Sequence, residues 1–219
     1  MAETAIITLL HVLVFVYWLG GDLGAFYSSR FLTADGVSVD RRLFAAKIVG
    51  DVDMAPRTAL ILAFPTGFHL ASVKGWITVD AHWIFAAWAA SLAWLTLAWF
   101  LHVQHGASAT WKSVDLAIRW AALAALAGTS FAALTGTLSV PAFLALKMLL
   151  LATAIGLGLL IRRMLQPLGP ALVGLTGDAP ETATQSLATT INTVRPAVMG
   201  IWLILVTSAL LGLWTPTAF

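Results

Sequence analysis

The sequence has no cysteine and few charged residues. Asp, Glu, Lys and Arg make up 10% of its 219 residues, against about 25% in an average soluble domain. Without cysteine, the chain cannot form disulfides, thiolate nucleophiles, cysteine-bound iron–sulfur clusters or the covalent haem linkage of paired cysteines. Any cofactor must therefore be held by histidine, methionine, lysine, carboxylate or backbone groups.

Two further absences concern targeting and partners. Residues 1–4 read MAET and lack the basic stretch and small-residue cleavage site of a signal peptide, so we expect the first hydrophobic segment to be retained. The formal net charge is only +2. The basic residues lie in short loops between hydrophobic segments, where membrane orientation explains them, so no nucleic-acid partner is expected.

What the sequence has in abundance is hydrophobic residues, which form 60% of the chain. We expect an all-α fold: a polytopic transmembrane helical bundle of about six spans, in contact with the lipid bilayer and forming a single domain over residues 1–219. The expected spans are residues 4–28, 55–73, 82–102, 116–138, 142–160 and 196–214.

Two polar stretches separate these spans. Residues 40–53 have apolar side chains at helical spacing among charges, which predicts an amphipathic helix lying at the membrane surface. Residues 166–193 contain several Pro and Gly, which predicts a loop followed by the polar start of a helix.

The distribution of Lys and Arg predicts the orientation in the membrane. With six spans, both termini lie on one side, and on that side the loops hold only Lys74. Because positive residues concentrate in cytoplasmic loops, we expect both termini in the periplasm and the protein in a bacterial inner membrane. The opposite side holds Arg30, Arg41, Arg42, Lys47, Arg57, Lys112, Arg119, Arg162, Arg163 and Arg195.

The first span carries two ionisable residues, His11 and Asp22. Steps of four, three and four residues from His11 lead to Phe15, Trp18 and Asp22, so all four share one stripe of a helix. An ionisable group inside a membrane is costly unless it is paired, ligated or hydrated, which makes both residues functional candidates. For His11 the alternatives are a hydrogen bond to a neighbouring helix and ligation of a metal.

Helical rise places three ionisable residues at one depth. His11, His69 and Lys147 would lie roughly 10, 7 and 9 Å below the outer surface. Two histidines on neighbouring helices are the arrangement expected for axial ligation of haem b, so His11 and His69 are the predicted metal ligands. His82, Lys74 and Trp18 are the further cofactor-binding candidates, the first two for the propionates near the outer surface and Trp18 beside the macrocycle.

Lys147 and Asp22 are the candidates for proton chemistry. Lys147 either extends toward the outer interface or is buried, where it could donate a proton, pair with a propionate or ligate a metal. Asp22 either pairs with Arg57 or Arg30, or starts a proton path toward His11.

Other polar residues near the inner surface have structural explanations. His102 and His105 end a helix, where positive charge suits the helix dipole. Asp115 and Arg119 are four residues apart and predict a local ion pair.

His11 is followed after six residues by Trp18, and then by Gly20 and Gly21. This pattern in the first span resembles the opening helix of the CopD-like and HemJ-like membrane proteins. Residues 24–31, GAFYSSRF, are similar to the glycine–aromatic–arginine ending of that helix in HemJ.

The fifth span extends the resemblance. Residues 146–149, LKML, running on to Arg162 and Arg163, are similar to a Leu-Lys-Leu helix with a basic end in both groups. The resemblance implies a small helical bundle in which His11 binds haem b and Lys147 serves protoporphyrinogen oxidation, as in HemJ-type oxidases. CopD-like members imply copper uptake instead.

Three functional hypotheses follow. The first is a haem b protein with a redox role, exchanging electrons with quinone or a partner subunit; whether it is itself an enzyme stays open. The second is a copper or other metal transporter, although Cu(I) prefers thiolate and thioether ligands and the methionines lack paired spacing. The third is an anchor subunit without a cofactor. A homo-oligomer is compatible with each.

Overall fold

The computed structural model describes residues 1–104, 108–177 and 179–216, and every regular element within them is helical. The predicted all-α bundle is therefore confirmed. The elements in chain order are α1 (Ala2–Ser29), η1 (Arg30–Leu32), α2 (Val39–Val52), α3 (Met54–Val73), α4 (Ala81–Val103), α5 (Ala109–Leu134), α6 (Ala142–Met164), α7 (Leu168–Gly174) and α8 (Pro180–Trp214).

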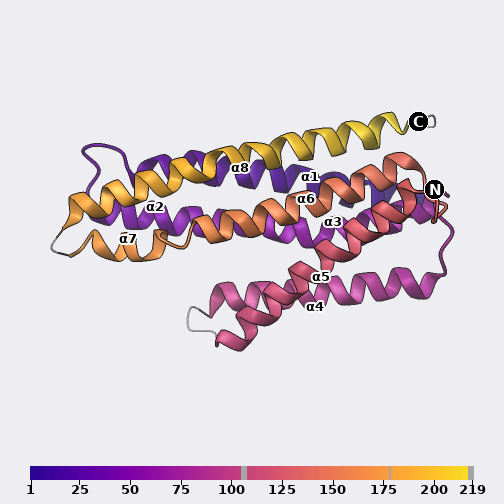
Figure 1. Cartoon of the computed structure of the whole chain (residues 1–219), viewed down its shortest axis with the longest axis horizontal. Helices are drawn as coiled ribbons and strands as arrows, with labels where there is room; N and C mark the ends of the chain where they lie inside the picture. Colours follow the sequence, from indigo (N-terminus) through magenta and orange to yellow (C-terminus); the bar gives the residue numbers. More distant parts are fainter. Residues whose placement is uncertain (105–107, 178, 217–219) are drawn as a thin grey trace.

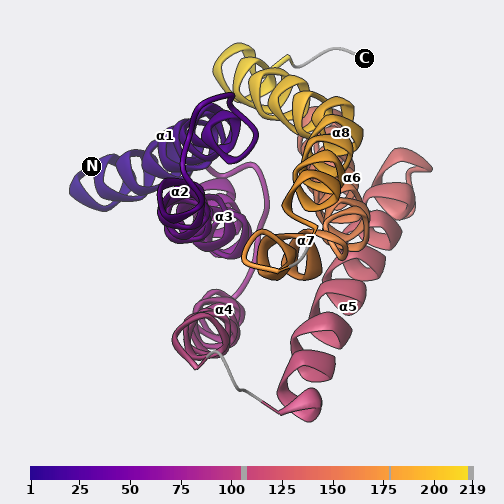
Figure 2. The same cartoon turned by 90° about the vertical axis from the view of Figure 1, so that its left-hand side faces the viewer.

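The long helices run side by side along one axis, and both termini lie at the same end (Figure 1). In the end-on view α1 lies beside α3 and α6 beside α8, while α5 flanks α6 and α4 stands apart from the other helices (Figure 2). The main contacts join α1 to α3, α5 to α6, α6 to α8 and α3 to α4. Because both termini lie at one end of the bundle, the chain crosses the membrane an even number of times. The periplasmic location of the termini remains a prediction.

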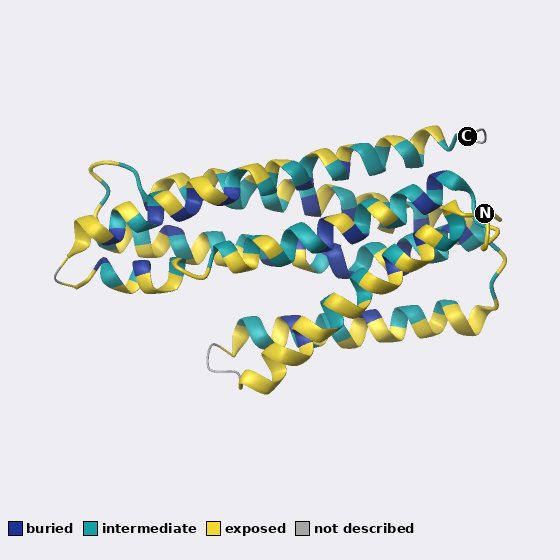
Figure 3. Ribbon diagram, viewed as in Figure 1, coloured by how far each residue is buried: buried dark blue, intermediate teal, exposed yellow. Residues whose placement is uncertain are grey.

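Five helical segments are long and apolar enough to cross a membrane, which makes the chain a multi-pass membrane protein. α3 is the sixth long helix. Its 20 residues include Arg57, two prolines and His69, so it is less apolar than the other five, and it packs along the length of α1. Exposed residues run along the outward faces of the long helices, as lipid contact requires (Figure 3).

The predicted fourth span, 116–138, was misplaced. α5 begins at Ala109 and ends at Leu134. Gly136 has φ +77°, and the amide groups of Gly136 and Thr137 donate to the carbonyls of Ala133 and Ala132. This glycine-dependent termination signal stops the helix at Leu134, four residues before the predicted end.

Residues 166–193 are mostly helical rather than a loop, which corrects the second polar stretch. α7 occupies Leu168–Gly174, and α8 starts at Pro180 and continues without a break through Pro196 to Trp214. Pro180 suits a first helical turn, where its missing N–H costs nothing. The helix therefore begins 16 residues before the predicted span.

The bounds of α2 lie close to the predicted amphipathic helix, but its direction differs. α2 continues the line of α3 instead of lying across the end of the bundle (Figures 1 and 2). It is held there by a small apolar cluster of Leu32, Ala45 and Ile191. Arg42 also donates from Nη1 to Thr184 Oγ1 of α8 at 2.7 Å. We call η1, α2, α7 and residues 180–195 of α8 the helical cap.

A buried carboxylate ties α4, α5 and α6 together near the cap. Asp115 is 2% exposed and accepts hydrogen bonds from Arg119 of its own helix at 3.0 and 3.2 Å. Trp94 Nε1 of α4 donates to it at 3.0 Å, and Arg162 Nη1 of α6 at 2.9 Å. The predicted Asp115–Arg119 pair is confirmed, and it is part of a larger network that satisfies the carboxylate from three helices.

Asp115→Asn should strongly destabilise the protein, because it leaves two arginine side chains without their carboxylate. Breaking a buried ion pair costs about 3–5 kcal/mol. Thermal or denaturant unfolding of the purified protein in detergent measures the change. The control is Lys47→Ala, which removes an exposed pair with Asp51 and should cost at most about 1 kcal/mol. Equal effects of the two substitutions would contradict the network's role.

Candidate functional site

Close contact between α1 and α3 positions the candidate site. A Cβ at Gly21 would lie 2.5 Å from Pro56 Cδ, and one at Gly24 would lie 3.2 Å from Val52 Cγ1. Nothing lies within 4 Å of a Cβ at Gly20. Gly21 and Gly24 are therefore the residues that let the two antiparallel helices approach closely.

His11 of α1 is oriented by Thr66 of α3. His11 Nδ1 lies 2.9 Å from Thr66 Oγ1, and that hydroxyl donates to the Leu62 carbonyl at 2.6 Å. Since the one hydroxyl proton is used on Leu62, Oγ1 accepts the bond from His11, and Nδ1 carries the imidazole proton. Nε2 is then the unprotonated nitrogen, with its lone pair free to bind a metal. The hydrogen bond to a neighbouring helix and the ligand role are thus compatible.

Gly67 provides the surface on which the imidazole rests. A Cβ at Gly67 would lie 3.1 Å from His11 Cε1 and 3.7 and 3.8 Å from the two ring nitrogens. A side chain at this position would press on the ring, so the glycine and the neighbouring Thr66 together set where the imidazole lies.

Lys147 of α6 reaches toward the same region. Its Nζ folds against α8, where a Cβ at Gly212 would lie only 2.6 Å away. The side chain is partly buried, and no carboxylate among the described residues pairs with it. Its ammonium is within electrostatic range of the His11 imidazole, and no hydrogen bond joins the two side chains in the described part of the chain.

His69, the third residue predicted at this depth, has partners of its own. Its Nε2 lies 3.1 Å from Glu3 Oε1, and Trp88 Nε1 donates to its Nδ1 at 3.4 Å. Since Nδ1 accepts from the indole, Nε2 carries the proton and donates to Glu3, so neither nitrogen is free. Glu3 lies eight residues before His11, about 12 Å along the helix. His69 itself is three residues after Thr66, about 4.5 Å further toward the termini, so its depth is close to the predicted one. Its two ring nitrogens are engaged, however, so it offers no free ligand atom.

Three further predicted cofactor residues do not join His11. His82 and Lys74 are exposed at the terminal end of the bundle, and the His82 ring lies beside Trp83 with centroids 5.0 Å apart. Trp18 is 4% exposed and belongs to the apolar core, together with residues such as Leu60. It is a packing residue in this structure.

The expected partners of Asp22 are engaged elsewhere. Arg57 pairs with Asp53, and the Arg30 guanidinium lies 4.2 Å from the centre of the Tyr27 ring. Asp22 Oδ2 is buried and has no hydrogen-bond partner among the described residues. Both predicted ion pairs of Asp22 are therefore wrong.

His102 contacts a carboxylate of another helix, a partner that its place at a helix end did not predict. Its Nε2 lies 3.4 Å from Asp51 Oδ1, which links α4 to α2. The pKa of Asp51 is lowered chiefly by the hydrogen bond from Lys47 and also by His102. His105 lies outside the described residues.

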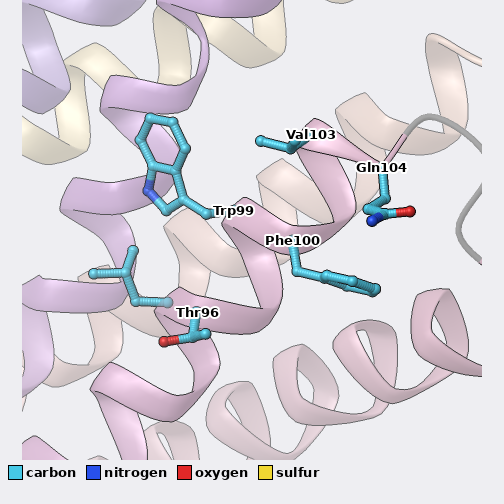
Figure 4. Close-up of a pocket in the computed structure, with 6 residues that line it drawn as sticks. Thr96, Trp99, Phe100, Val103 and Gln104 are labelled. Carbon is cyan, nitrogen blue, oxygen red and sulfur yellow. The ribbon is translucent and has the colours of Figure 1, made fainter.

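Neither cavity recorded in the structure contains a predicted site residue. One is a shallow groove along α4 of about 540 Å³ (Figure 4), and the other lies between α7 and α8 and is lined by small residues. No group of three or more His, Asp or Glu in the described ranges is placed to hold a metal. His11 Nε2 is thus the one predicted ligand atom that fits a metal centre. The groove in Figure 4 is lined by Leu95, Thr96, Trp99, Phe100, Val103 and Gln104.

The fold and site define a multi-pass helical membrane protein with a partly buried histidine whose tautomer is fixed by a threonine of the neighbouring helix. Comparisons of the chain with protein-family models, curated proteins and solved structures found no match.

Three site residues were missed by the sequence analysis: Thr66, Gly67 and Gly212. Thr66 and Gly67 directly follow Pro65. A hydroxyl residue next to a glycine within a membrane span is a signal of close contact with a neighbouring helix. For Gly212 the sequence offers no comparable signal, because its role depends on how α8 packs against α6.

Thr66→Val should release His11 from its single tautomer, because valine has the shape of threonine but cannot accept the Nδ1 proton. Nitrogen-15 NMR of histidine-labelled protein measures this: the His11 signals should change from a fixed Nδ1–H form to exchange between both forms. Thr58→Val is the matched control, since Thr58 lies on the same helix but accepts from Trp99. An unchanged His11 spectrum in Thr66→Val would refute the assignment.

Proposed function

We propose that this membrane protein binds haem b through Nε2 of His11 and has a redox role. The observation that carries the proposal is the hydrogen-bond chain from His11 through Thr66 to Leu62. Metal-binding histidines are commonly oriented by a hydrogen bond at the other ring nitrogen, which fixes the tautomer. Inside a membrane, an imidazole nitrogen with an unpaired lone pair is costly unless it binds a ligand.

Lys147 favours haem over a bare metal ion as the ligand of His11. A partly buried ammonium without a carboxylate partner suits an anionic group of the ligand, and haem carries two propionates. Its charge lies within electrostatic range of His11, so a propionate of a haem held by His11 would pair with it. When bound, haem would supply one-electron chemistry, and the protein would orient it and exclude water. The resemblance to HemJ-like proteins points to the same two residues.

The donor set disfavours copper transport. A Cu(I) path needs several soft ligands, whereas His11 Nε2 is a single nitrogen without a second free ligand among the predicted residues. Since the structure engages both nitrogens of His69, the proposal has one histidine ligand instead of the two that the sequence suggested.

His11→Ala should lose haem, while His69→Ala should retain most of it, because only His11 has a free ring nitrogen. The measurement is a reduced-minus-oxidised absorption spectrum with a pyridine haemochrome assay, on protein purified in mild detergent after expression with added haem. His102→Ala serves as the control, since His102 contacts Asp51 of the cap.

Each outcome of the spectra discriminates between hypotheses. Loss of haem in both His11→Ala and His69→Ala would restore the two-histidine site and overturn the single-ligand assignment. A colourless wild-type protein would refute the proposal. Metal analysis would then separate a copper-binding protein from an anchor without a cofactor.

Lys147→Met should weaken haem binding about tenfold, because methionine keeps the length of the side chain but removes the positive charge. Haem titration of apoprotein, followed at the Soret band, measures the affinity. Lys74→Met removes an exposed lysine and should leave the affinity unchanged. Equal affinities for the two variants would exclude an ion pair between Lys147 and haem.

A further inference from the structure

The network around Asp115 carries one more positive charge than its carboxylate neutralises. Arg119 donates from Nε and Nη2 to the two oxygens of Asp115, at 3.0 and 3.2 Å, and its side chain is only 14% exposed. This two-point pair already balances the carboxylate. Arg162 of α6 adds a second guanidinium through a single bond from Nη1 at 2.9 Å. Its charge therefore has no carboxylate of its own within the described ranges.

The guanidinium of Arg162 is both anchored and accessible. Its side chain is 49% exposed, although the bond to Asp115 holds one of its nitrogens in place. An arginine has five N–H donors in a planar fork. Nη1 is the only nitrogen of Arg162 with a protein partner in the described part of the chain. The remaining donors can therefore bind an external group of matching geometry, and phosphate is such a group.

The surroundings of Arg162 contain further cations but no second carboxylate. Asp115 is the only acidic residue between positions 81 and 177. Lys112 lies one turn before Asp115 on α5, and Arg163 directly follows Arg162 on α6, and both are exposed. Membrane orientation explains an excess of cations at this end of the bundle. It does not explain why one of them is anchored beside a carboxylate that another arginine already pairs.

The anchored guanidinium lies near the level of the lipid headgroups. α4 has 23 residues, about 34 Å, close to the roughly 30 Å of hydrocarbon in a bilayer. α4 ends and α5 begins away from the termini (Figure 1), and Arg162 lies in the last turn of α6 at that same side. Leu116 and Trp120 of α5, on either side of this level, are 40% and 56% exposed. The molecule that meets Arg162 here is therefore a membrane lipid.

We propose that Arg162 binds the phosphate of an anionic phospholipid, in the leaflet away from the termini. Two phosphate oxygens match the free donors of the guanidinium fork, and such charge-assisted pairs are strong. Basic sites between helices at this surface are known to select acidic headgroups. A zwitterionic lipid would bring an ammonium close to Lys112 and Arg163, with no carboxylate to receive it. The proposal is independent of haem.

The test is lipid binding to the full chain in detergent, followed by native mass spectrometry. The protein is titrated with phosphatidylglycerol, and separately with phosphatidylcholine of the same acyl chains. The wild type should bind the first phosphatidylglycerol about tenfold more tightly. Arg162→Gln should abolish most of this preference and leave the affinity for phosphatidylcholine unchanged. Arg163→Gln is the matched control, since it removes an exposed arginine of the same turn that has no bond to Asp115, and it should keep the preference.

Arg162→Lys is the second variant, in case Arg162→Gln does not fold. It keeps the charge beside Asp115 but loses the planar fork, so the preference should fall about threefold. Equal affinities of the wild type for the two lipids would overturn the proposal. Equal losses in Arg162→Gln and Arg163→Gln would also overturn it, because they indicate surface charge alone.

Inorganic phosphate offers the same chemistry without acyl chains, so it is added as a competitor in a further titration. The lipid site is supported when phosphate at the concentration of the lipid leaves phosphatidylglycerol bound. Complete displacement at that concentration would assign the site to free phosphate and overturn the lipid proposal.

Discussion

The close packing of α1 against α3 is the contact on which the rest of the structure depends. In hydrocarbon, helices gain little from burying apolar surface and associate instead through tight packing and hydrogen bonds between them. Gly21 and Gly24 remove the side chains that would hold the helices apart, and Gly67 does the same around His11. Only at this separation can the His11 imidazole reach the Thr66 hydroxyl. The glycines thus help to set the position of a side chain up to nearly four turns away.

The interior polar groups fall into two kinds. Asp115 and His69 are fully engaged by protein partners, and such groups join helices without offering chemistry. His11 and Asp22 keep one free atom each, at two levels of α1 about 16 Å apart. The residues between them on the same stripe are Phe15 and Trp18, both within the apolar core. The apolar core therefore lies between the two free atoms, which belong to separate levels of the bundle.

The sequence was sufficient for properties that depend on one helix and insufficient for those that depend on two. The helical class and the inward stripe of His11 and Trp18 follow from composition and periodicity, and Trp18 is indeed buried. The pairing of His11 with Thr66 instead of His69 depends on the register of two antiparallel helices, which no local pattern specifies. The misplaced end of α5 has a different cause, since Gly136 was a readable signal that hydropathy overrode.

The length of α8 has a mechanical consequence. Its 35 residues span about 52 Å, well beyond the roughly 30 Å of hydrocarbon in a bilayer. One unbroken rod therefore joins Thr184, clamped by Arg42 in the cap, to Gly212 beside the lysine ammonium near the opposite surface. A rod of this kind works as a lever. A partner that tilted the cap would shift Gly212 as well, and would move the lysine relative to the histidine without touching either.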